Sequence, residues 1–178
     1  MGWNHGLHLL AHRSACVLAA AAALTFVSAA GAADDTTASM AKPVNGRDPI
    51  KAFSEGVIAL DAGRFDQAAA ALQQAAEDSP ENSDVWRFIG AARAGTKDWA
   101  GSRAAYERAL KLSPLDVGSH AGLGVALFAL GDPRARAEAD WMAEKVRTCA
   151  GKCVDADYLG AMFDQVQDAA AGKFSPVL

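Results

Sequence analysis

The chain has 178 residues, with 17 Lys or Arg against 21 Asp or Glu, and its formal net charge at pH 7 is −4. A mildly acidic chain without clustered basic residues is a poor candidate for nucleic-acid binding, because that function needs such clusters to neutralise phosphates. After the N-terminal leader, no stretch is long and apolar enough to span a bilayer, so we expect membrane contact only through a partner.

The first 32 residues have the pattern of a signal peptide. Arg13 precedes an apolar stretch over residues 15–27, and small residues follow it, with Ala30, Gly31 and Ala32 forming an A-x-A cleavage site. A retained membrane anchor is the alternative, but it would need about 20 apolar residues. We therefore expect an exported protein, and the alanine-rich leader suggests a bacterial periplasm.

Residues 33–47 read as a disordered linker. They contain Asp, Thr, Ser, Lys, Pro, Asn and Gly and show no apolar periodicity. The folded part should therefore begin near Asp48 and contain about 125 residues, which is the size of one small domain.

A fixed period then organises the chain. Gly56, Gly90 and Gly124 are each 34 residues apart, and so are Pro80 and Pro114. A period of this length predicts stacked helical hairpins. We assign three units to residues 49–82, 83–116 and 117–150, which predicts an all-α fold.

The remaining segment, residues 151–178, should contain a loop, a helix and a tail. Tyr158, Leu159, Met162, Phe163 and Val166 form an apolar helical stripe over residues 155–170. Such a helix would cap the apolar face that the last hairpin exposes. A swapped or dimerising helix is the alternative.

The repeating units resemble tetratricopeptide repeats. In the middle unit the residues at signature positions are Trp86, Ile89, Gly90, Trp99, Tyr106, Ala109, Leu110 and Pro114. The third unit departs from the signature at His120, Pro133, Arg136 and Asp140, so its second helix should pack unusually. The resemblance implies a short right-handed solenoid of helical hairpins that binds other proteins and is not an enzyme.

The resemblance also implies a binding surface, lined by the first helix of each hairpin. Carried over by position, this predicted groove comprises Phe53, Val57, Leu60, Arg87, Ala91, Ala121, Val125 and Phe128. It is shallow and apolar, with one cation, and we expect it to bind a peptide segment or a partner subunit. In the alternative, several of these residues pack against neighbouring hairpins, or the capping helix folds into the groove.

Cys149 and Cys153 are the only cysteines after the leader. In an oxidising compartment such a pair usually forms a disulfide, and a structural bridge is the favoured interpretation. The alternative is a thiol–disulfide or copper-handling site. Redox pairs generally have two intervening residues, whereas this pair has three.

The sequence shows no catalytic motif and no metal, cofactor or small-molecule site. His120 is the only histidine after the leader, and no nucleophilic constellation accompanies it. It occupies a position where the family usually has a large aromatic residue, so we expect a structural role for it.

Overall fold

The computed structural model describes residues 48–174 and residue 176. The expected signal peptide (1–32) and linker (33–47) lie outside the described residues, as do residues 175, 177 and 178. The described part contains seven α-helices and no strand, which confirms the all-α prediction. None of these helices is sufficiently long and apolar to cross a membrane.

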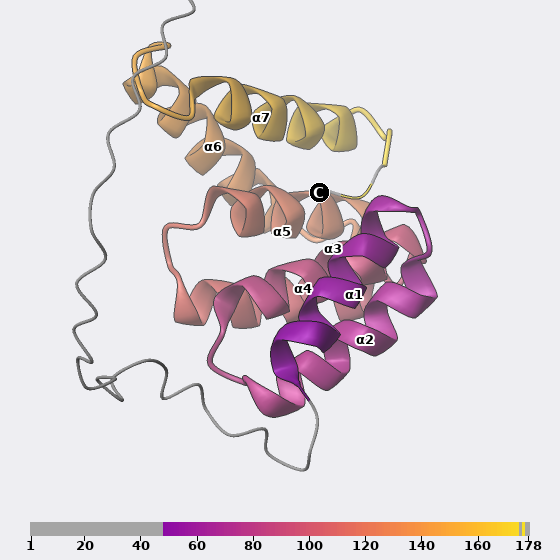
Figure 1. The fold of residues 1–178 in the computed structure, drawn as a ribbon. Helices are drawn as coiled ribbons and strands as arrows, with labels where there is room; N and C mark the ends of the chain where they lie inside the picture. Colours follow the sequence, from indigo (N-terminus) through magenta and orange to yellow (C-terminus); the bar gives the residue numbers. More distant parts are fainter. Residues whose placement is uncertain (1–47, 175, 177–178) are drawn as a thin grey trace, which may run out of the picture. The chain divides into compact units, whose positions relative to one another are not determined.

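The first six helices form three consecutive hairpins (Figure 1). Their bounds are α1 Pro49–Asp61, α2 Phe65–Asp78, α3 Ser83–Gly95, α4 Trp99–Leu112, α5 Val117–Leu130 and α6 Ala135–Cys149. Each helix packs against the next in sequence, and α1, α3 and α5 also pack in succession. The three hairpins lie inside the three predicted 34-residue units, and the fold is a helical-hairpin solenoid.

Acidic and amide side chains fix where the hairpin helices begin. Asp48 accepts hydrogen bonds from the amides of Ile50 and Lys51 at the start of α1. Asn82, Asp98 and Asp116 cap α3, α4 and α5 in the same manner. Each cap satisfies an amide that has no partner within its helix, and such a cap typically stabilises the fold by about 1 kcal/mol.

The turn inside each hairpin uses one left-handed residue at the same position of the 34-residue period. In the first and third hairpins this residue is glycine, Gly63 with φ 69° and Gly131 with φ 66°. In the second it is Lys97, with φ 63°. A side chain costs roughly 1 kcal/mol or more in this conformation, so the turn geometry is imposed by the packing of the two helices.

The ring of Tyr106 in α4 lies between two helical glycines. A Cβ atom on Gly90 of α3 would approach the ring to 2.8 Å, and a Cβ atom on Gly122 of α5 would overlap it. Tyr106 is 1% exposed. One aromatic ring therefore joins three consecutive helices, and both glycines are needed because they leave room for it.

The third hairpin packs differently from the second, as the sequence departures predicted. At the start of α6 the amides of Ala135 and Arg136 donate tight i→i+3 bonds to the carbonyls of Asp132 and Pro133. Glu138 faces Gly124. Asp140, which repeats the position of Tyr106, is exposed.

A seventh helix, α7 (Ala156–Ala170), covers the end of the stack. It packs against α5 and α6, and its buried residues are Leu159, Met162, Val166 and Ala169. Tyr158 lies near Gly118 and Val166 near Gly124, so α5 and α7 run in the same direction. The predicted capping helix is therefore present, packed on its own chain.

We expect Gly122→Ala to lower the free energy of unfolding by about 1–3 kcal/mol, because the new methyl group would displace the buried Tyr106 ring. Urea unfolding followed by circular dichroism measures this. Gly160→Ala in α7 is the matched control, since no atom lies within 4 Å of its added Cβ. That variant should gain up to about 1 kcal/mol from helix propensity. Equal effects of the two substitutions would contradict the packing described here.

Candidate partner-binding surface

Four of the eight predicted groove residues are in the core. Leu60 and Ala91 are each 1% exposed and pack in the cluster of the first two hairpins. Ala121 and Val125, at 0% and 2%, pack in a cluster with residues of α7. In this conformation neighbouring helices cover these four side chains, so they are not accessible to a partner. The alternative stated above therefore describes these positions.

The other four residues, Phe53, Val57, Arg87 and Phe128, are half-buried. Phe128 packs against two core clusters, whereas Phe53 packs against one. The remaining three lie on α1 and α3, together with Phe88, whose ring meets that of Phe53 edge to face with centroids 5.6 Å apart. We name Phe53, Val57, Arg87 and Phe88 the α1–α3 surface. The predicted groove thus narrows to the first two hairpins.

Arg87 is neutralised by two carboxylates. Its Nη2 lies 3.0 Å from Asp84, and its Nε lies 3.6 Å from Asp116. Its guanidinium also lies over the Phe88 ring, 4.3 Å from the centroid. The cation expected in the groove is therefore already paired, and its flat face supports the aromatic ring. Sequence reasoning identified Arg87 but not its partners, which come from another turn of α3 and from the next repeat.

Two tyrosine hydroxyls lie close enough to Arg87 for its charge to affect their pKa. The hydroxyl of Tyr106 has no hydrogen-bond partner among the described protein groups. Burial raises the pKa of Tyr106, against the opposing effect of Arg87. Burial also raises the pKa of Tyr158, whose hydroxyl lies next to Gly118. Both phenols therefore remain neutral near physiological pH and act as hydrogen-bonding groups only.

His120 is held by two acceptors and an aromatic ring. Its Nδ1 lies 2.7 Å from a carboxylate oxygen of Glu138, and its Nε2 lies 3.0 Å from the carbonyl of Pro114. The imidazole stacks on Trp141 with centroids 3.7 Å apart. Only the imidazolium can donate to both acceptors. Burial alone would lower the pKa of His120, but the bonds to Glu138 and Pro114 outweigh it and raise the pKa. These contacts give His120 a role in joining α5 to α6.

Cys149 and Cys153 lie at disulfide geometry, with Cα atoms 5.3 Å apart. Cys149 ends α6, and the loop that follows turns through left-handed residues Ala150 and Gly151. Over the described residues, no group of three or more His, Cys, Asp or Glu side chains could hold a metal ion. The arrangement gives no support to a copper site.

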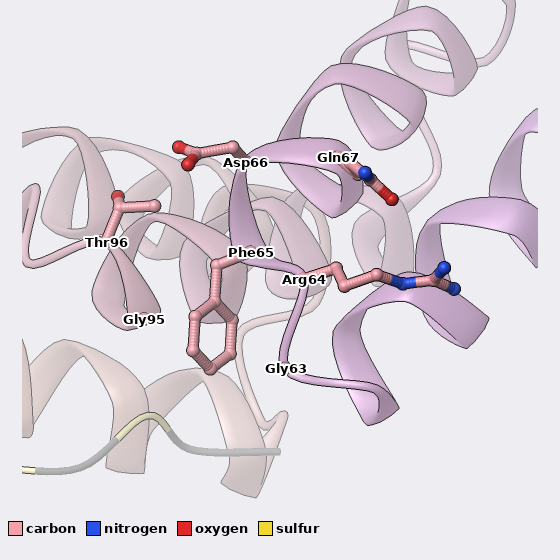
Figure 2. Close-up of a pocket in the computed structure, with 7 residues that line it drawn as sticks. All are labelled: Gly63, Arg64, Phe65, Asp66, Gln67, Gly95 and Thr96. Atoms are coloured by element: carbon pink, nitrogen blue, oxygen red, sulfur yellow. The ribbon is translucent and has the colours of Figure 1, made fainter.

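A separate pocket of about 540 Å³ lies along the turns of the first two hairpins (Figure 2). Its lining is Gly63, Arg64, Phe65, Asp66, Gln67, Gly95 and Thr96. Figure 2 shows the side chains of Arg64 and Asp66 pointing away from one another, so they form no charged pair in the pocket. The pocket presents no convergent catalytic groups and includes none of the predicted groove residues.

Comparison with known proteins identifies the class of this fold. A family model of the tetratricopeptide repeat matches residues 53–116 and 97–144, which together span more than half of the chain. The chain belongs to the tetratricopeptide repeat family. The repeats indicate a protein–protein interaction module, and proteins of this family are generally not enzymes.

One curated relative is a TPR repeat-containing protein of Pseudomonas aeruginosa. It is 41% identical over 58 residues, which correspond to 33% of this chain and 55% of that protein. The chain thus spans about half the length of this relative.

The contacts of His120 predict a pH-dependent stability. Because the folded pKa is raised above 6.5, the contribution of His120 is complete below that pH and is lost as pH rises through the folded pKa. We expect urea titrations to show that the free energy of unfolding falls as the pH rises from 6.5 through the folded pKa. The NMR titration midpoint of the imidazole should lie above 6.5. His120→Phe, which keeps a ring against Trp141, should lack this dependence. An imidazole midpoint below 6.5 would contradict the assignment.

Proposed function

We propose that this protein is an exported, periplasmic interaction module that binds a peptide segment or partner subunit on the α1–α3 surface. The observation that carries the proposal is the half-buried aromatic pair Phe53 and Phe88 on the first helices of two adjacent repeats. Large aromatic side chains that remain partly exposed supply much of the binding energy at protein interfaces.

The charge around this surface favours an uncharged or weakly basic partner segment. Arg87 is paired with both Asp84 and Asp116, so the local balance is one cation against two carboxylates. A partner carboxylate would therefore meet net negative charge. Apolar side chains of the partner would pack on the aromatic edges, and its backbone or basic groups would face the carboxylates.

Export is proposed from the leader over residues 1–32, which combines Arg13, a short apolar stretch and an A-x-A site. An oxidising compartment also agrees with a structural bridge between Cys149 and Cys153, whose Cα separation of 5.3 Å suits a disulfide. We propose that this bridge fixes the bend between α6 and α7. Cell fractionation followed by N-terminal mass analysis of the protein tests the export step.

The surface is tested by affinity capture from envelope extract with wild-type and variant protein. We expect Phe53→Asp to weaken binding of the recovered partner by about tenfold, the ratio that corresponds to ~1.4 kcal/mol, because a carboxylate would replace an aromatic contact. Ile58→Asp is the control, since Ile58 is an exposed apolar residue on the same helix. Both variants must keep the thermal unfolding midpoint within a few degrees. If Phe53→Asp captured the same partner as strongly as the wild type, the assignment of the α1–α3 surface as the binding site would be wrong.

A thiol assay tests the bridge. The protein purified from the periplasm, denatured without reductant, should show no reactive thiols, because both cysteines of the processed chain are oxidised. After reduction, two equivalents should appear. Two equivalents before reduction would show that Cys149 and Cys153 are free and that the bend is held by packing alone.

A further inference from the structure

A second pocket, of about 370 Å³, lies between the loop that joins α4 to α5 and the loop that joins α6 to α7. We name it the loop pocket. The N-terminal ends of α5 and α7 lie on the same side of the stack (Figure 1) and both contribute to it. Its lining includes Leu115, Asp116, Val117, Val154, Asp155 and Tyr158. Its volume is near the lower end of the range of ligand pockets, roughly 300–1,000 Å³, and gives room for a large side chain.

Large apolar side chains are exposed around this pocket. Leu115 is 72% exposed, Val154 is 101% exposed and Tyr158 is 41% exposed. They come from two segments, residues 115–117 and 153–159, that are distant in sequence and meet only in the fold. Isolated surface apolar residues need no explanation, but several gathered around one hollow mark a docking site.

The charged groups in the lining are both carboxylates, Asp116 and Asp155. Asp116 already shares Arg87 with Asp84 and accepts a hydrogen bond from the amide of Ser119. Asp155 precedes α7 but makes no side-chain cap bond, and no ion pair with it occurs among the described residues. The pocket therefore combines apolar walls with an excess of negative charge, since Arg87 is shared between Asp84 and Asp116 and no ion pair with Asp155 occurs among the described residues. This charge is complementary to a cationic ligand.

One wall of the pocket belongs to the loop held by the two cysteines. The amide of Cys153 lies 3.4 Å from the sulfur of Cys149, and the amide of Lys152 donates to the Cys149 carbonyl at 2.9 Å. These bonds fix the chain just before Val154 and Asp155. A wall of fixed geometry lowers the entropy cost of binding.

We propose that the loop pocket is a second docking site, which accepts a bulky apolar side chain of a partner segment that carries Lys or Arg beside it. The apolar side chain would lie against Leu115, Val154 and Tyr158, and the basic groups would face Asp116 and Asp155. This site borders the α1–α3 surface at Asp116, which is paired with Arg87, but its lining contains neither Phe53 nor Phe88. The proposal therefore does not depend on binding at the α1–α3 surface.

The test uses short blocked peptides and the purified protein. The probe is Gly-Lys-Phe-Lys-Gly, and the controls are Gly-Lys-Ala-Lys-Gly, which lacks the apolar side chain, and Gly-Glu-Phe-Glu-Gly, which reverses the charge. Binding is followed by the amide chemical shifts of the protein. We expect the probe to shift residues 115–118 and 153–159 and to bind at least fivefold more tightly than either control. Added salt should weaken the binding, because the charges are near the surface.

Paired variants distinguish binding of the probe in the loop pocket from nonspecific electrostatic attraction to the protein surface. We expect Leu115→Ala and Asp155→Asn each to weaken binding of the probe at least threefold. Their controls are Leu130→Ala and Asp164→Asn, both exposed and outside the pocket lining, which should bind as the wild type does. All four positions are exposed, so the fold should tolerate the changes. Equal binding of the charge-reversed peptide, shifts outside the pocket, or unchanged affinity in both pocket variants would overturn the proposal. A negative result for partner binding at the α1–α3 surface would not contradict the loop-pocket proposal.

Discussion

The stack depends on one aromatic ring held between two glycines. Tyr106 fills the space between α3 and α5 from its position on α4, and it can do so only where Gly90 and Gly122 expose bare backbone. The first hairpin has a similar arrangement with a smaller side chain, because Leu72 of α2 packs on Gly56 of α1. Large side chains on the second helices thus pack against glycines on the first helices, and this packing sets how closely neighbouring hairpins approach.

The capping helix decides which part of the first-helix face remains open. Residues of α7 pack with Ala121 and Val125 of α5, and this contact removes the third hairpin from the predicted groove. The first two hairpins keep a partly exposed aromatic pair, Phe53 and Phe88. One helix therefore covers the terminal core, shortens the predicted groove and, through its first turn, forms a wall of the loop pocket.

The apolar stripe over residues 155–170 predicted the extra helix. The 34-residue period was sufficient to predict the hairpins, because glycine and proline recur at fixed positions. It could not predict the fate of Ala121 and Val125, since their burial depends on where a helix about 40 residues later packs. The same limit applies to Arg87, because Asp116 belongs to the next repeat. Nor did the period reveal Gly122 as a contact of Tyr106. That glycine lies outside the 34-residue series and is recognised only when α4 and α5 are placed together.

The parallel packing of α7 on α5 makes the array directional. A further hairpin inserted after α6 would compete with α7 for the same face of α5, so tandem duplication of a unit at that end would first have to displace this helix. Gene duplication after α6 could therefore lengthen this array only if α7 moved from α5 to the last added hairpin.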